Sequence, residues 1–183
     1  GTSVALATSG SVRGIIPFST SSTAHFAVVI DSGTAIAIDQ FTITGNDFSN
    51  IAAATNPSVT VLNDASGGID LGTGGVKLVQ GVDIDGNNYQ DIVIGYTDAT
   101  DSTPKVCILP NDGSDIGNTC ATRISLPSTG TIKDIQFADI SGDTLDDMIV
   151  HLQTASGNSL YIYENQNNTL AGLFQAVQTL SLS

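Results

Sequence analysis

Apolar residues occur along this chain in short runs, separated by polar segments rich in Gly, Asn, Asp, Ser and Thr. Two of these runs, "DIVIGY" at 91–96 and "DMIVHL" at 147–152, are apolar at nearly every position. Successive side chains of a strand point to opposite sides of its sheet, so consecutive apolar positions place hydrophobic groups on both faces. The pattern predicts short strands in sheets that are covered on both sides.

The same pattern is repeated along the chain. "VKLVQGVDIDGNNYQDIVIGY" (76–96) aligns without gaps with "IKDIQFADISGDTLDDMIVHL" (132–152), at a spacing of 56 residues. A weaker copy, "IAIDQFTITGNDFSNIAAAT" (36–55), lies 41 residues upstream of the first. Each copy predicts a strand, a polar loop, an apolar strand, a turn and a third strand. The segment "AHFAVVIDSG" (24–33) resembles the third strand of an earlier, incomplete unit.

Repeats of this length, with strands buried on both faces, are typical of the blades of a β-propeller. We therefore predict an all-β fold and a single β-repeat domain over residues 1–183. Its units are expected at about 1–35 (partial), 36–75, 76–131 and 132–183. Three clear four-stranded blades and a partial one are few for a propeller, so we expect part of a larger propeller or one that another chain completes.

The charge balance limits the classes of partner. The chain has 18 acidic residues against five basic ones, a net charge of -13, and Glu164 is its only glutamate. Nucleic acids and anionic membranes attract basic surfaces, so neither is an expected partner. No apolar stretch approaches the roughly 18 residues that a membrane-spanning helix needs, so no membrane insertion is expected. Cations are the natural counter-charge.

The two polar loops of the strong repeats carry regularly spaced oxygen groups. Carboxylate, amide, hydroxyl and carbonyl oxygens without His or Cys favour Ca²⁺ over zinc or copper. We expect one ion in each loop, about two Ca²⁺ per chain. The predicted ligands of the first loop are Asp83, Asp85, Asn87, the carbonyl of Tyr89, and Asp91; those of the second are Asp139, Ser141, Asp143, the carbonyl of Leu145, and Asp147.

Two other loop assignments are weaker. An EF-hand needs Gly at position 6 and Glu at position 12 of its loop, where this chain has Asn88 and Ile94, and then Thr144 and Val150. The third copy of the loop offers only uncharged side-chain oxygens, which bind Ca²⁺ weakly, and we expect its side chains to hydrogen-bond the turn internally. Its residues in the corresponding places are Thr42, Thr44, Gly45, Asn46 and Asn50.

The segments "DIDGNNYQDIVIG" and "DISGDTLDDMIVH" resemble the FG-GAP or VCBS-type repeats of integrin-alpha-like β-propellers, whose motif is Asp-x-Asp-Gly-Asp-Gly-x-x-Asp-hydrophobic. The resemblance covers about residues 36–168. It implies blades in which a hairpin loop between the first two strands binds Ca²⁺, and ligands that bind another face of the propeller. The chain departs from the motif at the sixth position, where neither loop has Gly.

Cys107 and Cys120 flank a turn-rich segment, "ILPNDGSDIGNT", and we expect them to form a disulfide worth about 3 kcal/mol. The alternative is two buried free thiols. A disulfide predicts an extracellular or cell-surface protein. In that setting the sequon Asn167-Asn168-Thr169 is a candidate glycosylation site at Asn167.

The sequence offers little for catalysis. His25 and His151 lie in separate apolar strands, and a structural role is expected for both. No GxSxG motif is present, and Asp146 and Asp147 are adjacent strand residues that point to opposite faces. We therefore expect a protein that is not an enzyme.

Two functions fit these features. The first is a calcium-stabilised extracellular β-propeller that binds a protein or glycan ligand, for example in cell adhesion. The alternative is a structural subunit of an extracellular filament or surface layer, which self-associates through open blade edges.

Overall fold

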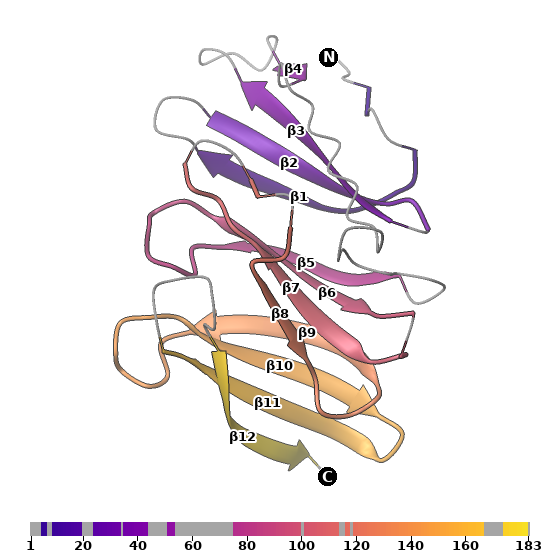
Figure 1. Ribbon diagram of the computed structural model, residues 1–183, viewed down its shortest axis with the longest axis vertical. Helices are drawn as coiled ribbons and strands as arrows, with labels where there is room; N and C mark the ends of the chain where they lie inside the picture. Colours follow the sequence, from indigo (N-terminus) through magenta and orange to yellow (C-terminus); the bar gives the residue numbers. More distant parts are fainter. Residues whose placement is uncertain are drawn as a thin grey trace.

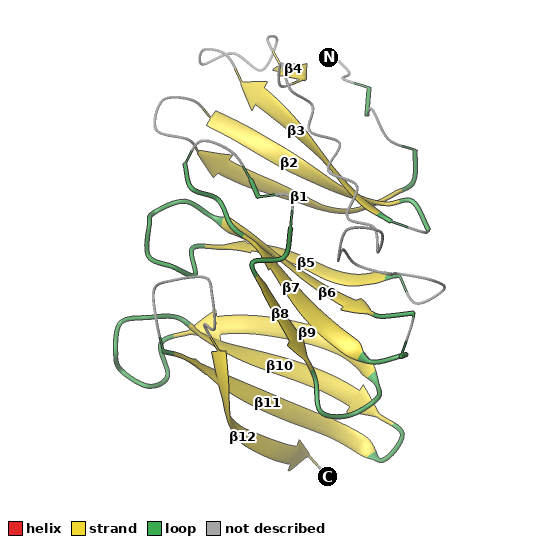
Figure 2. Cartoon of the chain, in the orientation of Figure 1, coloured by secondary structure: helices red, strands yellow, loops and turns green. Residues whose placement is uncertain are grey.

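The computed structural model describes residues 5–6, 9–19, 24–33, 35–43, 51–53, 75–99, 101–113, 116–117, 119–166 and 174–182. All regular structure in these ranges is β-strand, which confirms the predicted all-β fold (Figure 2). The described part of the chain contains no helix long and apolar enough to cross a membrane.

In the described ranges, twelve strands form three four-stranded antiparallel sheets, and each sheet follows the order of the chain. The first sheet comprises β1 (Ser11–Ser19), β2 (Ala24–Asp31), β3 (Ile36–Ile43) and β4 (Ile51–Ala53). The second comprises β5 (Val76–Val82), β6 (Asp91–Thr97), β7 (Pro104–Leu109) and β8 (Thr122–Ser125). The third comprises β9 (Thr131–Ala138), β10 (Asp147–Thr154), β11 (Gly157–Asn165) and β12 (Phe174–Leu182). The sheets are stacked along the long axis of the molecule (Figure 1).

The first sheet is divided differently from the sequence repeat. Residues 36–43 and 51–53 were predicted to open a new unit, but they are β3 and β4, the last two strands of the first sheet. The segment at 24–33, predicted as a third strand, contains β2, the second strand. The predicted boundary between residues 35 and 36 therefore lies within a paired sheet. The reason is that β3 pairs with β2 along its whole length, from Ile36 opposite Asp31 to Ile43 opposite Ala24.

The second sheet is buried on both faces, as its consecutive apolar residues predict. Alternate residues of β6, among them Ile92 and Ile94, belong to the core shared with the first sheet. Val93 belongs to the core shared with the third sheet, and all three side chains are 0 % exposed. Burying such a side chain contributes about 1.5–3 kcal/mol, so both interfaces stabilise the stack.

Glycines allow neighbouring sheets to approach closely. A Cβ atom at Gly81 of β5 would lie 2.5 Å from Cγ2 of Ile16 on β1, and one at Gly14 of β1 would lie 2.9 Å from Cβ of Val79. Both distances are shorter than real side chains adopt, so a larger residue displaces the neighbouring strand. In each contact the glycine backbone of one strand therefore packs against a side chain of the other: Gly81 of β5 against Ile16 of β1, and Gly14 of β1 against Val79 of β5.

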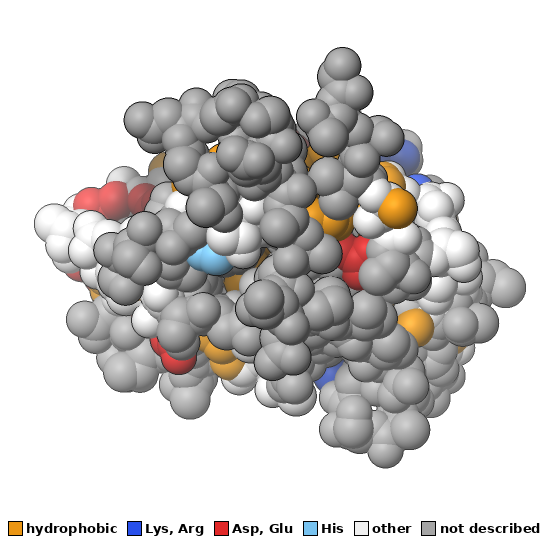
Figure 3. All heavy atoms as spheres, turned by 90° about the horizontal axis from the view of Figure 1, so that it is seen from above, with side chains coloured by type: hydrophobic (Ala, Val, Ile, Leu, Met, Phe, Trp, Pro, Cys, Tyr) orange, Lys and Arg blue, Asp and Glu red, His pale blue; other side chains and the backbone are white. Residues whose placement is uncertain are grey.

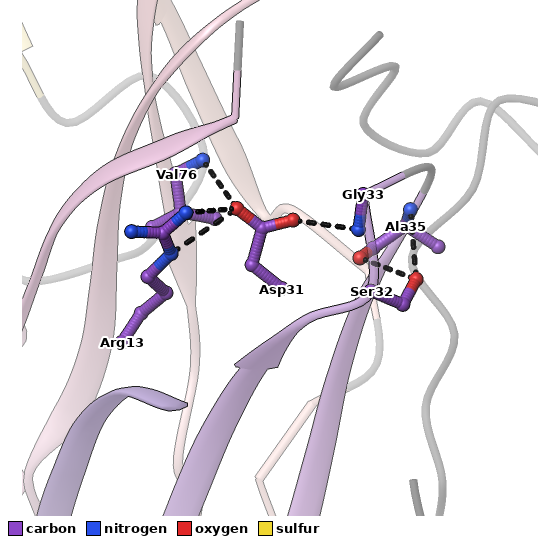
Figure 4. A network of polar contacts seen from close by, with 6 residues as sticks. All are labelled: Arg13, Asp31, Ser32, Gly33, Ala35 and Val76. Carbon is purple, nitrogen blue, oxygen red and sulfur yellow. Dashed lines mark hydrogen bonds and ion pairs between the residues drawn. The ribbon is translucent and has the colours of Figure 1, made fainter. Parts of the chain in front are cut away.

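A polar contact links the same two sheets at one end (Figure 4). Asp31, at the end of β2, accepts hydrogen bonds from Nε and Nη2 of Arg13 at 3.1 and 2.9 Å. Its Oδ2 also accepts from the backbone N–H of Val76 at 3.3 Å, and Oδ1 accepts from Gly33 at 2.8 Å. Burial opposes ionisation of this carboxyl, but the hydrogen bonds and the guanidinium outweigh it and lower its pKa. Asp31 thereby fixes the start of β5 against the first sheet.

Replacing Gly81 by Ala tests how tightly the first two sheets pack. We expect Gly81→Ala to lower the free energy of unfolding by about 1–3 kcal/mol, because its Cβ overlaps the branched side chain of Ile16. Lys77→Ala, at an exposed position of the same strand, is the control and should change stability by less than about 0.5 kcal/mol. Equal effects in urea unfolding would show that Gly81 is not a contact point.

Candidate metal centre

The two loops predicted to bind Ca²⁺ have the same position and backbone conformation. Each joins the first two strands of its sheet, after the pair Val82–Asp91 in the second sheet and the pair Ala138–Asp147 in the third. The fourth residue of each loop is a glycine with positive φ, 73° at Gly86 and 83° at Gly142. The 56-residue repeat therefore corresponds to a repeat in three dimensions.

The sixth loop position explains the departure from the glycine-rich motif. Asn88 and Thr144 occupy it with φ values of 70° and 77°. The backbone thus keeps the left-handed conformation that glycine adopts freely, although neither residue is glycine. Asn tolerates this conformation, whereas a β-branched residue such as Thr144 is strained in it. Without glycine at this position the turn costs more conformational energy, but its backbone still has positive φ.

Three carboxylates gather in the first loop. One oxygen each from Asp83, Asp85 and Asp91 lie within 4.8 Å of one another. Asp83 and Asp85 are half-buried, and Asp91 is 0 % exposed. In the described residues no other group of three metal-ligating side chains is this close. The donor set is entirely oxygen and carries three negative charges, which fits a hard divalent cation such as Ca²⁺.

Hydrogen bonds shape this loop but leave its charge uncompensated. Asp83 accepts from the backbone N–H groups of Asn87 and Asn88 at 3.1 and 2.8 Å, and Asp85 also accepts from Asn87 at 3.1 Å. The N–H of Tyr89, whose carbonyl is a predicted ligand, donates to Oδ1 of Asn87 at 2.7 Å. No basic side chain contacts the triad within the described hydrogen bonds and ion pairs, so only neutral donors, the backbone N–H groups and the Asn87 side chain, bond to the three carboxylates.

Asp91 has the most perturbed carboxyl group of the triad. Burial raises its pKa to about 6, and the charges of Asp85 and Asp83 add to this rise. Hydrogen bonds from the N–H groups of Asn111 and Ile84, at 2.8 and 3.0 Å, act in the opposite direction but do not cancel it. Burial and the charge of Asp83 likewise raise the pKa of Asp85. The ionised triad is therefore destabilised unless a cation joins it.

Asn111 is a supporting residue that the sequence analysis missed. It follows β7, and its carbonyl accepts a hydrogen bond from Nδ2 of Asn87 at 2.8 Å. Its side chain donates to the carbonyl of Gln90 at 3.1 Å. Asn165, the last residue of β11, makes the matching contact: its N–H donates to Oδ1 of Asp147 at 2.9 Å. An asparagine at or just beyond the end of the third strand in both repeats is the signal that identifies these residues.

The second loop keeps the turn but does not gather its carboxylates. Asp139, Ser141 and Asp143 are exposed. Asp139 instead accepts from the N–H groups of its own turn, at Gly142, Asp143 and Thr144. Asp143 accepts from the N–H of Leu145, whose carbonyl is the remaining predicted ligand. The two loops therefore differ although their turns are alike, and one difference is in the sequence itself, where Ser141 replaces Asp85.

Asp147 differs electrostatically from Asp91, its counterpart in the repeat. Burial acts to raise its pKa, but hydrogen bonds from the N–H groups of Asn165, Ser141 and Ile140 outweigh burial and lower the pKa. Three donors satisfy this carboxylate without an ion. A cation would therefore stabilise the ionised carboxylates of the second loop less than those of the first.

Asn165 also connects the two loops. Its Nδ2 atom donates to the carbonyl of Ile84 in the first loop at 3.1 Å and to the carbonyl of Asp146 in the second at 3.3 Å. The residue is 0 % exposed. One buried side chain therefore bonds to the backbone of both loops.

Other predicted residues have simpler outcomes. Cys107 and Cys120 form the predicted disulfide. Nδ1 of His25 is 3.2 Å from Oγ1 of Thr42, and Nε2 of His151 is 3.0 Å from Oδ1 of Asn158. The candidate glycosylation site Asn167 and residues 44–50 of the weakest loop lie outside the described residues.

Charged side chains elsewhere do not gather in the same way. Figure 3, which looks down on the end of the molecule that carries the first sheet, has acidic and basic side chains at separate places. Lys105 is one of five basic residues in the chain, and its ammonium group contacts Asp98 and Asp101 at 2.7 and 3.0 Å. That cluster is balanced by its own lysine, unlike the triad of the first loop.

No family model matches this chain, and comparisons with curated proteins and with solved structures also gave no match. The resemblance to FG-GAP repeats therefore stays a prediction from the sequence motif.

The raised pKa of Asp91 predicts how the metal-free protein responds to pH. Between its ordinary pKa of 3.8 and the folded value of about 6, the folded state binds more protons than the unfolded state. In chelator-treated protein, stability should therefore fall as pH rises from about 4 to about 6. Asp147, with a lowered pKa, has the opposite sign and loses stability only as pH falls below its ordinary 3.8.

Thermal melts across this pH range with EDTA measure the effect, and Asp91→Asn is the matched variant. It should flatten the slope between pH 4 and 6 because the titrating group is gone, whatever its effect on absolute stability. An unchanged slope in the variant would assign the pH dependence to other groups.

Proposed function

We propose that this protein is a calcium-stabilised extracellular β-propeller module that binds a protein or glycan ligand. The observation that carries the proposal is the carboxylate triad of Asp83, Asp85 and Asp91, within 4.8 Å at one end of the second sheet. Repulsion among three carboxylates opposes folding of the loop, and a divalent cation removes it. The ion would thus act as a structural clip that holds β5 and β6 together.

The chemistry of the donors favours calcium over other cations. Asn87 and the carbonyl of Tyr89 add neutral oxygens to the three carboxylates, and Ca²⁺ takes six to eight oxygen ligands in flexible geometry. We propose the second loop as a weaker site, which would give about two ions per chain. Its exposed Asp139 and Asp143 would have to move toward Asp147 to bind.

The order of the sheets supports the propeller part of the proposal. The first strands β1, β5 and β9 contact one another in succession, β1 with β5 and β5 with β9. First strands in succession around an axis are the arrangement of propeller blades. Three sheets would then be part of a larger ring or of a ring that another chain completes.

The disulfide is consistent with an oxidising, extracellular environment. A net charge of -13 disfavours nucleic acid and anionic membranes as ligands. The sequence has no GxSxG motif, so we propose binding rather than catalysis. The ligand would contact loops other than those that hold the ions.

Calcium titration of chelator-stripped protein tests this proposal. We expect calorimetric binding and, with calcium at 100 times the dissociation constant, about 2.7 kcal/mol of added stability. For a domain of this size that is a rise in melting temperature of roughly 5–10 °C. Asp83→Asn should lower the affinity at least tenfold and leave the metal-free melting temperature unchanged or higher.

The matched control is Asp134→Asn, which removes one negative charge from β9, outside both loops. It should leave calcium affinity within about twofold, because long-range charge effects are screened by salt. Absence of any calcium binding would overturn the proposed function. Equal loss of affinity in both variants would show that the net charge of the protein, and not the triad, determines calcium binding.

A structural subunit that self-associates is the second candidate. β12 is a nine-residue strand at the outer edge of the third sheet, whereas β8 at the edge of the second has four residues. On β12, Leu180 is 39 % exposed. Long edge strands with exposed apolar residues favour pairing with another chain.

Size-exclusion chromatography with and without EDTA distinguishes the two candidates. The binding module predicts a monomer at micromolar concentration in both conditions. Large assemblies that Leu180→Lys disperses would favour the filament or surface-layer subunit, because a charge on an edge strand disfavours pairing.

A further inference from the structure

The segment closed by the disulfide packs directly on the first loop. Asn111, within this segment, donates its N–H to Oδ1 of Asp91 at 2.8 Å and accepts from Nδ2 of Asn87 at 2.8 Å. The segment therefore contacts two of the five residues predicted to hold the cation. One contact fixes a carboxylate and the other fixes an amide.

A second contact joins the segment to the loop through an aromatic ring. A Cβ atom at Gly113, which has φ of 84°, would lie 2.3 Å from the ring of Tyr89. The ring thus lies against the glycine backbone. Since the carbonyl of Tyr89 is a predicted ligand, the segment also restricts this third position of the loop.

The disulfide holds Asn111 in place by closing the segment. Cys107 lies in β7 and is 0 % exposed, and Cys120 lies just before β8. Between them the chain folds back on itself, since Asn111 forms a β-bridge with Ile116 and the N–H of Gly117 donates to the carbonyl of Pro110 at 2.6 Å. Ile116 is 4 % exposed in the same core as Cys107. The bond therefore anchors both ends of a small folded support.

The second loop provides an internal comparison. Asn165 donates to Asp147 as Asn111 donates to Asp91, but the chain has only two cysteines, so no disulfide follows β11. The carboxylates of that loop are exposed and are not gathered. Ser141 of the second loop stands where the first loop has Asp85, so one triad carboxylate is missing there. The loop with the gathered triad is also the one that the disulfide-closed segment contacts.

We propose that the disulfide-closed segment, residues 107–120, positions the first loop for its cation through Asn111, so that the cation affinity depends on the Cys107–Cys120 bond. This inference rests on the proposed calcium function. Reduction by a dithiol transfers two electrons and two protons to the disulfide, giving two cysteine thiols and one oxidised dithiol. Freed at one end, the segment no longer fixes Asp91 and Asn87. Asn111 is a positioning residue and not itself a ligand.

If the disulfide affects Ca²⁺ binding, then Ca²⁺ binding must affect the stability of the disulfide to the same extent. If oxidation raises the affinity for Ca²⁺ by a given factor, Ca²⁺ favours the disulfide over the dithiol by that factor. A tenfold coupling corresponds to about 30 mV in the reduction potential of a two-electron couple. A support that only stabilised the fold generally would not make the potential depend on calcium.

The experiment measures both sides of this coupling on the full chain. Calorimetric titration with CaCl₂ should show at least tenfold weaker binding after reduction by dithiothreitol than in the oxidised protein. Redox titration in dithiothreitol buffers should show a midpoint about 30 mV more negative with saturating Ca²⁺ than with EDTA, for the tenfold case. Asn111→Ala with the disulfide intact should also weaken Ca²⁺ binding at least tenfold, which decides the matter if the reduced chain unfolds.

Asn158→Ala is the matched control, because it removes an asparagine amide that bonds to His151 on the third sheet instead. It should leave both calcium affinity and the redox midpoint unchanged. Equal affinity in the oxidised protein, the reduced protein and Asn111→Ala would overturn the positioning role and leave the calcium function intact. Absence of Ca²⁺ binding to the oxidised protein would overturn both.

Discussion

Burial of the second sheet on both faces is the constraint on which the rest of the structure depends. Ile92 and Ile94 pack toward the first sheet while Val93 packs toward the third, so neither neighbour can be removed without exposing a core. The two carboxylate-rich loops lie at the ends of the second and third sheets, where the backbone turns between the first two strands.

One buried carboxylate, that of Asp91, lies at such a sheet end beside the first loop. Asp91 is the first residue of β6, and its side chain is 0 % exposed and accepts hydrogen bonds from the N–H groups of Ile84 in the loop and Asn111 after β7. Two backbone N–H groups satisfy its geometry, yet its pKa is raised to about 6, because burial and two nearby carboxylates outweigh them. Asp147 has three N–H donors and a lowered pKa. Asp147 also accepts a hydrogen bond from the Ser141 side chain, whereas Asp91 has two carboxylates beside it.

The sequence predicted what depends on local chemistry. The apolar runs at 91–96 and 147–152 identified strands buried on both faces, and the repeat aligned Asp83 with Asp139 in loops of the same conformation. The strand partners of residues 36–53 were misplaced because their loop resembled the first loop in polar composition. Any hairpin of a four-stranded meander has the pattern strand, loop, strand, so the pattern does not say which hairpin it is. The pairing of β3 with β2 decides it, and that depends on contacts between distant residues.

The contrast between the two loops shows which part of a metal site a motif can encode. Spacing of oxygen residues and two positive-φ positions specify the turn, and both loops have them. In the first loop, where the carboxylates are gathered, Asn111 and Gly113 from another strand connection also contact the loop residues. These residues lie more than twenty positions along the chain from Asp85, outside any loop motif. Affinity for the ion is therefore expected to follow the packing around the loop more closely than the loop sequence itself.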